Sequence, residues 1–272
     1  MGETPLLPIF DAGTDPGPSF LDLLRRVAPE ALAMPAAPSG APLPFDAPHG
    51  TTVVAIRCEG GVVMAGDRRA TAGHSIANRR IEKVFLADDH SGVAIAGTAG
   101  LAVEMVRLFQ VQLEHYEKVE GEALSLEGKA NQLAQMVRAN LPAAMQGLVV
   151  VPLFVGYDLR RGHGRVFSYD AVGGKYEEAD FAANGSGSVH ARNWIKAGWR
   201  EDVDAGTAVD LAIRSLFAAA DEDTATGGPD LVRGIFPLVA TIDADGFRTM
   251  PESEVAERAQ ALLEGPERGG AA

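Results

Sequence analysis

The pattern of apolar and polar residues changes sharply at about residue 50. Before this point prolines interrupt every apolar stretch, and ten of the sixteen prolines lie at or before Pro48. Proline removes a backbone donor and restrains the residue before it, so this leader cannot sustain a sheet or long helices. Residues 19–28 are the exception, because a capping serine and apolar residues at helical spacing predict a short helix there. We interpret the leader as a flexible arm, either a disordered tail or a propeptide that is later removed.

From residue 52 onward, short runs of apolar and β-branched residues alternate with turn residues and with longer amphipathic segments. The short runs predict strands at about residues 52–57, 62–66, 83–86, 93–96, 149–157, 164–169, 176–183 and 235–242. The amphipathic segments predict helices at about residues 101–120, 128–145, 189–198, 205–220 and 253–263.

This order of elements indicates the fold class. Blocks of strands alternate with pairs of helices, which differs from the regular alternation of a doubly wound parallel sheet. The order favours two antiparallel sheets stacked face to face, with helices on both outer sides. The sequence therefore predicts an α+β protein, a four-layer αββα sandwich.

Composition and charge exclude several classes of protein. The formal net charge of −13 argues against a nucleic-acid-binding surface, and the pairs of adjacent arginines are scattered along the chain. A single cysteine, Cys58, excludes an intramolecular disulfide and fits the reducing cytoplasm. No histidine or cysteine pair has metal-ligand spacing, so we expect neither a metal nor a cofactor. No apolar run approaches the ~20 residues of a membrane span, and no secretory signal is present.

The junction between leader and core carries the first candidate chemistry. Thr51 and Thr52 directly follow Gly50 and begin the first predicted strand. Cleavage of the Gly50–Thr51 bond would leave a hydroxyl and a primary amine on the same residue. Such a threonine supplies a nucleophile and its general base together. Without support from the rest of the chain, however, Thr51 is only the start of a strand.

Four further features bear on this hypothesis. They are Asp67 at the end of the second strand, Lys83 at the start of the third, the small residues 96–100, and the two loops 184–188 and 223–230. Each also has an ordinary explanation. Aspartate after glycine commonly forms a turn, a strand lysine is usually solvated, and glycine-rich loops are mostly turns.

Taken together, these features match a known pattern. From Thr51 to about residue 265 the chain resembles the β subunits of the 20S proteasome, most closely those of actinobacteria. The resemblance rests on the Gly-Thr-Thr junction and on residues 62–69, 96–99, 185–188 and 226–237, in order and at matching spacing.

The resemblance implies an N-terminal-nucleophile hydrolase whose residues 1–50 are removed autocatalytically, leaving a catalytic domain at residues 51–272. Thr51 would be the nucleophile, with Asp67 and Lys83 beside it, and Gly97 would supply the oxyanion-hole amide. The surrounding network would consist of Ser186, Asp223 and Thr226. Many members of the family have serine in place of Thr226, so the hydroxyl is retained here with an added methyl group.

The resemblance also implies a substrate site. The pocket for the residue before the scissile bond would be lined by Ala70, Ile81, Ile95, Ala99 and Val103. These side chains are apolar and several are small, so the pocket should accept large apolar residues and gain free energy by burying them. Thr71 and Ala99 would hold the substrate backbone as in a β-strand. The alternative is that the pocket residues are ordinary core.

Elementary acid–base chemistry supports these roles. An α-amino group has a pKa of about 7.7–8.0, so a neutral fraction exists at physiological pH to accept a proton. A Lys83 ammonium held by Asp67 would favour alkoxide character at Thr51. In the precursor the nitrogen of Thr51 is an amide and is not basic, so the leader keeps the protease inactive. Gly50 would let the backbone adopt a strained conformation at the cleavage point.

The family forms four stacked seven-membered rings, with β rings inside and α rings outside. The resemblance thus implies α subunits and other β subunits as partners, and an ATPase ring that delivers unfolded or tagged proteins. The expected activity is that of a self-processing threonine endopeptidase in the cytoplasm. Two alternatives remain: an HslV-type threonine peptidase, which usually lacks a long leader, and a non-catalytic β-type ring subunit.

Overall fold

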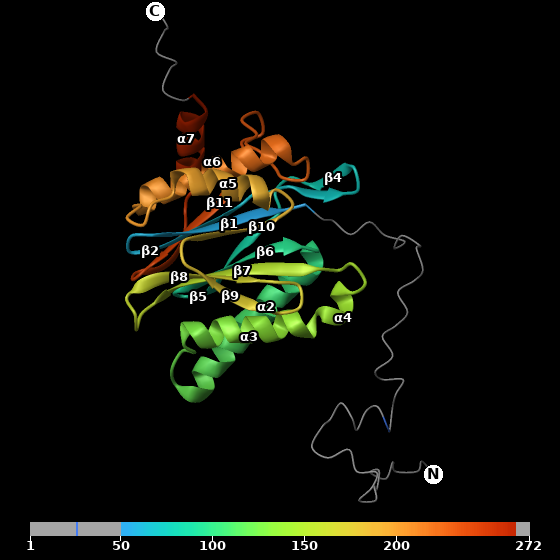
Figure 1. Cartoon of the computed structure of the whole chain (residues 1–272), viewed down its shortest axis with the longest axis vertical. Helices are drawn as coiled ribbons and strands as arrows, with labels where there is room; N and C mark the ends of the chain where they lie inside the picture. Colours follow the sequence, from blue (N-terminus) through green and yellow to red (C-terminus); the bar gives the residue numbers. More distant parts are fainter. Residues whose placement is uncertain (1–25, 27–49, 265–272) are drawn as a thin grey trace, which may run out of the picture. The chain divides into compact units, whose positions relative to one another are not determined.

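In the computed structural model, Arg26 and residues 50–264 are described. The chain separates into two units, residues 1–45 and 46–272. Of the first unit only Arg26 is described, in helical conformation, so the rest of the helix expected at residues 19–28 lies outside the described residues. The second unit contains two five-stranded sheets with helices on their outer sides (Figure 1).

All strand pairings within the two large sheets are antiparallel. The first sheet consists, in spatial order, of β10 (Phe181–Gly185), β1 (Thr52–Cys58), β2 (Gly61–Gly66), β11 (Leu238–Asp243) and β12 (Gly246–Thr249). The second sheet consists, in spatial order, of β5 (Val84–Asp88), β6 (Ser91–Gly97), β7 (Val150–Asp158), β8 (His163–Tyr169) and β9 (Lys175–Glu178).

Helices cover the outer face of each sheet (Figure 1). The first sheet is covered by α5 (Ser188–Gly198), α6 (Ala205–Glu222) and α7 (Glu252–Glu264). The second sheet is covered by α2 (Ala99–Glu120) and α3 (Leu126–Ala139), and the short α4 (Leu141–Ala144) follows α3. None of the described helices is long and apolar enough to cross a membrane.

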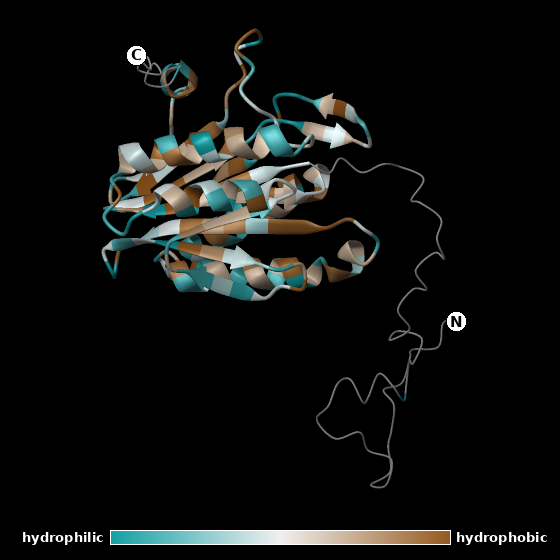
Figure 2. Ribbon diagram, turned by 45° about the horizontal axis from the view of Figure 1, so that its top comes forward, coloured by the Kyte–Doolittle hydropathy of each residue, from teal (hydrophilic) through white to brown (hydrophobic). Residues whose placement is uncertain are grey.

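Apolar side chains form three layers, one between the sheets and one under each layer of helices. Successive residues of a strand point to opposite faces of its sheet. In β1, Val53 and Ala55 lie between the sheets, whereas Val54 and Ile56 pack under the helices of the first sheet. Both faces of the strands are therefore buried, and Figure 2 shows mainly brown and white strands between helices that carry teal segments. The predicted α+β sandwich is confirmed.

Two expected elements are divided in the structure. The helix expected at residues 128–145 breaks at Asn140, since Pro142 cannot donate the next helical hydrogen bond. The strand expected at residues 176–183 is two strands, because the chain bends at residues 179–180 and crosses from the second sheet to the first. Here the polar edge strand β9 gives way to the more buried β10.

Three short strands were not expected from the sequence. A hairpin of β3 (Ala70–Ala72) and β4 (Ser75–Asn78) lies between β2 and β5, and all four residues of β4 are exposed. Such a strand has no buried face and therefore no apolar alternation to detect. Strand β12 is equally short, and β11 begins at Leu238 because Ile235 forms only an isolated bridge with Asp230.

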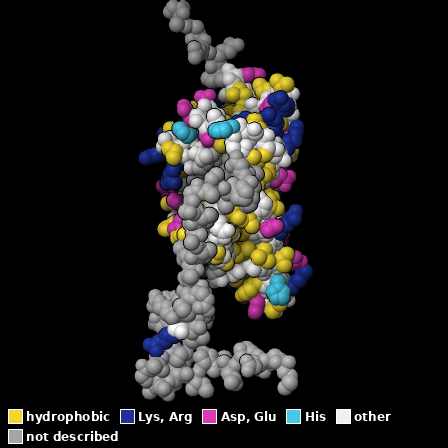
Figure 3. Space-filling model, turned by 90° about the vertical axis from the view of Figure 1, so that its right-hand side faces the viewer, with side chains coloured by type: hydrophobic (Ala, Val, Ile, Leu, Met, Phe, Trp, Pro, Cys, Tyr) yellow, Lys and Arg dark blue, Asp and Glu magenta, His cyan; other side chains and the backbone are white. Residues whose placement is uncertain are grey.

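Acidic and basic side chains are interspersed on the face shown in Figure 3, without one large basic patch. Among the described residues, Arg165 on β8 is the most buried cationic side chain, at 3% exposure. Its guanidinium donates to Glu177, Asp158 and Glu127, at 2.7, 3.1 and 2.6 Å. Glu127 lies in the first turn of α3, so this ion cluster links α3 to the second sheet.

The Arg165 cluster predicts acid sensitivity. Hydrogen bonds from Lys175 and Arg165 lower the pKa of Glu127, and that from Arg165 lowers the pKa of Glu177. Burial raises the pKa of Asp158, but hydrogen bonds from residues 160, 161 and 165 outweigh it and the net pKa is lowered. A carboxylate whose pKa is lowered by folding stabilises the folded state at pH values above its unfolded pKa. This stabilisation is lost as the pH falls through the pKa of the folded state.

We therefore expect Arg165→Met to lower the thermal unfolding midpoint strongly at pH 7, and by less as the pH falls towards 3 and the carboxylates take up protons. Removing one partner of a buried pair costs about 3–5 kcal/mol, an upper bound here because the carboxylates are partly exposed. The measurement is the unfolding midpoint of both proteins across this pH range. An equal loss at both pH values would contradict the assignment of these carboxylates.

Candidate active site

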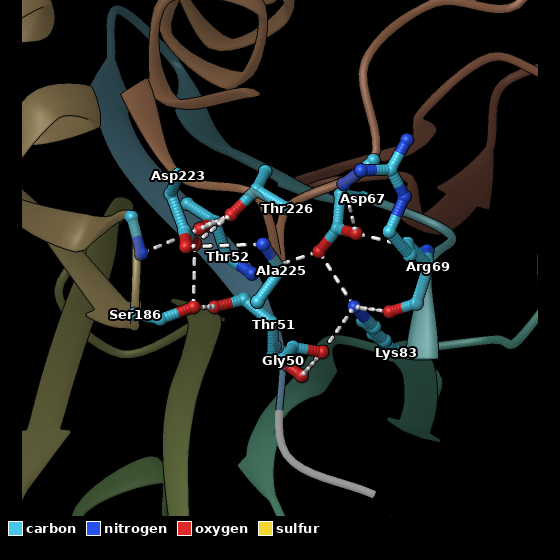
Figure 4. A network of polar contacts seen from close by, with 12 residues as sticks. Gly50, Thr51, Thr52, Asp67, Arg69, Lys83, Ser186, Asp223, Ala225 and Thr226 are labelled. Atoms are coloured by element: carbon cyan, nitrogen blue, oxygen red, sulfur yellow. Dashed lines mark hydrogen bonds and ion pairs between the residues drawn. The ribbon is translucent and has the colours of Figure 1, made fainter. Parts of the chain in front are cut away.

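Thr51 directly precedes β1 and is 5% exposed. Its position is fixed just beyond the end of β10, because the backbone N–H of Ser186 donates to the Thr51 carbonyl at 2.9 Å. Thr52 pairs with Gly185 of β10, which fixes the register of the two strands at this point. Figure 4 shows Thr51 between two groups of polar side chains, one around Asp67 and Lys83 and the other around Ser186 and Asp223.

The Thr51 hydroxyl contacts the peptide bond that precedes it. The chain is continuous through Gly50 and Thr51, and Thr51 Oγ1 donates to the Gly50 carbonyl oxygen at 2.6 Å. The same oxygen accepts a hydrogen bond from Lys83 Nζ at 3.0 Å. The nucleophile candidate and a cation thus converge on the carbonyl group of the bond whose cleavage would release a Thr51 amine.

The contacts of Lys83 fix its protonation state. Its Nζ donates to Asp67 Oδ1, the Arg69 carbonyl and the Gly50 carbonyl, at 2.6, 2.5 and 3.0 Å. None of these acceptors has a proton to give, and only an ammonium has three N–H groups. Burial lowers the pKa of Lys83 below its usual value, and the charge of Asp67 and its hydrogen bond offset this only in part. Lys83 is therefore a charged group that is 4% exposed and fully hydrogen-bonded.

Asp67, at 1% exposure, is oriented entirely by the backbone and by Lys83. Its Oδ1 accepts from Thr52 N at 2.7 Å and from Lys83, and its Oδ2 accepts from Arg69 N and Gly227 N at 2.9 and 2.8 Å. Four donors stabilise the carboxylate in a buried position. Asp67 therefore has little freedom to move, and it holds Lys83 beside Thr51.

The second polar group is a directed chain of hydroxyls. Asp223 Oδ2 accepts from Ser186 Oγ at 2.5 Å and from Thr226 Oγ1 at 2.6 Å. Because Thr226 donates to the carboxylate, it must accept from Thr52 Oγ1, which lies 2.6 Å away. Burial raises the pKa of Asp223, but the hydrogen bonds from Ser186 and Thr226 outweigh it, and the pKa is lowered. The methyl group of Thr226 does not disturb this chain.

The first of two hollows beside Thr51 holds most of the expected substrate pocket. It is lined by Gly50, Thr51, Ala70, Ile81, Glu82, Lys83, Ile95, Gly97, Ala99 and Ala102. Its volume of about 10 Å³ is the space of roughly one water, so the hollow is nearly closed while Gly50 is attached. Val103 does not line it and instead packs, partly buried, against the core below the second sheet. Glu82 and Ala102 line it without having been expected.

Gly97 lines both hollows and can only be glycine. Its φ is +113°, and a Cβ would lie 2.1 Å from the Val149 carbonyl oxygen of the neighbouring chain segment. Gly97 ends β6 immediately before α2. The structure therefore places backbone, and no side chain, beside Thr51 at this position.

The expected strain at Gly50 takes another form. Gly50 is not among the glycines with positive φ. The space where a side chain at residue 50 would begin is instead occupied, since a Cβ there would lie 2.6 Å from Thr71 Oγ1 and 2.9 Å from Ala225. The close approach of Thr71 and Ala225, and not a left-handed backbone, explains the need for glycine.

We accordingly expect Gly50→Ala to slow cleavage at the junction by about 10-fold or more, since the added methyl group must displace the carbonyl from Thr51 and Lys83. The rate is measured by intact mass during assembly. Gly100→Ala serves as a control, because a Cβ there meets nothing within 4 Å. Processing at the wild-type rate in Gly50→Ala would show that the carbonyl position is not critical.

Several groups of this site could not be found from side-chain types. They include the Arg69 carbonyl and the backbone N–H of Gly227, together with Gly187, whose N–H donates to Thr52 Oγ1 at 3.1 Å. Backbone groups leave no specific trace in a sequence. Thr52 itself was visible as the second threonine of the junction. Within the described residues, no group of three or more His, Cys, Asp or Glu side chains is arranged to hold a metal ion.

Comparison with known proteins places this chain in a family. Residues 47–232 match the family model described as "Proteasome subunit". A protein named "Proteasome subunit beta" from Acidimicrobium ferrooxidans is 60% identical over 94% of this chain and 93% of its own length. Proteins of the same name from Streptomyces griseus and Acidothermus cellulolyticus are 56% and 57% identical, over 90% and 87% of this chain and 88% and 83% of their own lengths. The chain therefore belongs to the proteasome subunit family, among its β subunits.

Proposed function

We propose that this chain is the catalytic β subunit of a 20S proteasome core, a threonine endopeptidase that first cuts its own Gly50–Thr51 bond. One observation carries the proposal: Thr51 Oγ1 and Lys83 Nζ both donate to the Gly50 carbonyl oxygen, at 2.6 and 3.0 Å. A hydroxyl and an ammonium placed on the carbonyl of the preceding residue are suited to intramolecular acyl transfer. An assembly-only subunit would not need this arrangement.

Self-cleavage begins when Thr51 Oγ1 attacks the Gly50 carbonyl carbon. Lys83, the cation on the carbonyl oxygen, stabilises the negative charge that develops there. The C–N bond breaks, and the hydroxyl proton passes to the departing nitrogen, leaving an ester to the Thr51 oxygen. Water then hydrolyses this ester, which releases residues 1–50 with a Gly50 carboxyl group and restores the Thr51 hydroxyl.

Cleavage changes the two donors at once. Thr51 Oγ1 and Lys83 Nζ lose the acceptor that they share, and the Thr51 nitrogen becomes a primary amine. The amine has a pKa in the range of about 7.7–8.0 before the influence of neighbours, so it can take the hydroxyl proton at neutral pH. The released N–H of Lys83 then favours negative charge on the nucleophile. Residues 1–50 thereby act as a propeptide of the catalytic domain 51–272.

The substrate preference follows from the first hollow. Its described side chains are apolar apart from Thr51, Lys83 and Glu82, and Ala70, Ile95 and Ala99 leave room for a large side chain once Gly50 has gone. We therefore assign cleavage after large apolar residues, with Gly97 providing the oxyanion amide. Thr71 lies close to the position of Gly50 and would guide the substrate backbone.

The partners follow from membership of the family. We assign this chain to β rings stacked between rings of α subunits, with an ATPase ring that delivers unfolded or tagged proteins. The single buried cysteine, whose pKa burial raises to about 11, is compatible with a reducing cytoplasm.

The test is intact mass and N-terminal sequencing of particles made by co-expression with the α subunit, together with hydrolysis of peptides that end in a large apolar residue before a reporter group. An N-terminus at Thr51 and peptide hydrolysis support the proposal. Assembled particles that retain the leader, or that are trimmed to Thr51 and hydrolyse no peptide, would instead support a structural ring subunit.

A further inference from the structure

A second hollow lies on the other side of Thr51. Its volume is about 280 Å³, much larger than the first hollow and close to the size of small-ligand sites. It opens between the two sheets, where β6 and β7 of the second sheet face β10 of the first. Thr51, Gly50 and Gly97 line both hollows, so the reacting atoms lie at the boundary between them.

This position assigns the hollow to one part of the substrate. In the proposed reaction, the residue before the scissile bond occupies the first hollow and its carbonyl oxygen faces Gly97. The chain beyond the scissile bond must then leave past Thr51 on the opposite side. The second hollow is the space there that Thr51 and Gly97 also line. The second hollow therefore contacts the residue after the scissile bond, which is the first residue of the leaving group.

The second hollow is lined by apolar residues and by uncharged polar residues, and no charged side chain is among them. Asn184, Ser186 and Ser188 line it from β10 and the start of α5, and Ala96 and Val151 line it from the second sheet. Ser186 Oγ is committed to Asp223, and Asn184 Nδ2 is committed to the Pro152 carbonyl at 3.1 Å. The side-chain oxygen Oδ1 of Asn184 and the hydroxyl of Ser188 take no part in these two bonds, so they can bind a ligand. A hydroxyl or amide side chain can bond to both, whereas the hollow has no charged side chain to pair with an ionic one.

We propose that this hollow binds the first residue after the scissile bond and selects uncharged polar side chains there, with Asn184 and Ser188 as the specificity-determining residues. The inference rests on the proposed peptidase function and adds a preference on the leaving-group side. It gives the enzyme selectivity on both sides of the cut: large apolar before it, and hydroxyl or amide after it.

The experiment uses assembled, processed particles and internally quenched peptides. The peptides share one sequence before the scissile bond and carry Ser, Asn, Leu, Trp or Asp directly after it, with the cut position verified by mass spectrometry. We expect kcat/KM for Ser and Asn to exceed that for Trp and Asp by about 10-fold or more, since a site built for hydrogen bonding discriminates against groups that leave it unpaired. Equal rates across the series would overturn the proposal.

Ser188→Phe separates the two sides of the site. The added ring fills the second hollow, so we expect kcat/KM for the extended peptides to fall by about 10-fold or more. A peptide boronate forms its adduct with Thr51 and extends only toward the first hollow, so its affinity should stay at the wild-type value. Ser253→Phe is the matched control, since Ser253 is exposed on α7. A parallel loss of boronate affinity, or unchanged peptide cleavage, would overturn the assignment.

Asn184→Leu provides an independent test if Ser188→Phe does not assemble. It replaces the amide wall by an apolar one of similar volume, so the preference should shift from Asn toward Leu after the scissile bond. An unchanged Asn-to-Leu ratio would contradict the role of Asn184. Wild-type particles that neither bind the boronate nor cleave any peptide would refute the proposed function itself, and the leaving-group preference with it.

Discussion

Thr51→Ala is expected to block both maturation and proteolysis. The substitution removes the oxygen that donates to the Gly50 carbonyl at 2.6 Å, and the described residues offer no other hydroxyl bonded to that carbonyl. Assembled particles should therefore keep residues 1–50 attached. Peptide hydrolysis should fall by about 10⁶-fold, the scale seen when a hydrolase loses its nucleophile. Intact mass reports the first effect, and hydrolysis of an apolar reporter peptide reports the second.

Two controls separate these effects. Thr51→Ser keeps the hydroxyl and should mature and hydrolyse peptides, at a lower rate if the lost methyl loosens the rotamer. A chain expressed from residue 51 onward tests catalysis without self-cleavage: it should be active with Thr51 and inactive with alanine there. Activity in the alanine variant of this shortened chain would assign the nucleophile to another residue.

The fold was predictable where strands are buried on both faces. Residues 52–66 and 149–169 of the two sheets have continuous apolar runs, and their strands lie within one or two residues of the predicted bounds. Prediction failed where burial does not dictate the pattern. The four exposed residues of β4 pair with β3 without contributing to the core, and the strand at residues 176–183 contains a bend that only the crossing between sheets explains.

The candidate site was predictable to the extent that its chemistry lies in side chains. The sequence and the family resemblance indicated Thr51, Asp67 and Lys83, and the structure brings these three together. Lys83 Nζ donates to Asp67 Oδ1 at 2.6 Å, and both Lys83 Nζ and Thr51 Oγ1 donate to the Gly50 carbonyl, at 3.0 and 2.6 Å. The acceptors and donors that orient them are backbone groups, such as the Arg69 carbonyl and the Gly227 N–H. Their positions depend on loops that come together only in the folded chain, so no local sequence pattern predicts them.

Gly50 shows the same limit in another form. The sequence indicated that glycine is needed before the cut, and attributed this to backbone strain. The structure attributes it to Thr71 and Ala225, which approach from residues far away along the chain. A steric requirement of this kind follows from tertiary packing, so the residue type was predictable while its physical cause was not.

Lys83→Met is expected to have the second large effect. It removes the cation that contacts the Gly50 carbonyl and leaves the Asp67 carboxylate buried, with three backbone donors but no counter-charge. Breaking one partner of a buried pair costs about 3–5 kcal/mol of stability. Self-cleavage should fall by about 100- to 1000-fold, as when an oxyanion-stabilising donor is lost. Peptide hydrolysis should fall by about as much, because the Thr51 oxygen loses the cation that favours its negative charge. Processing half-times, kcat/KM and the unfolding midpoint are measured on the same preparation.

Lys129→Met distinguishes catalysis from stability in this comparison. Lys129 is also a buried lysine, 7% exposed and paired with Asp88, but it lies on α3 beneath the second sheet and away from Thr51. The same substitution there should lower the unfolding midpoint by a similar amount and leave self-cleavage and kcat/KM close to the wild-type values. Comparable loss of activity in both variants would mean that the effect of Lys83→Met is a consequence of destabilisation, because only a cation that contacts the reacting carbonyl can alter the chemical step selectively.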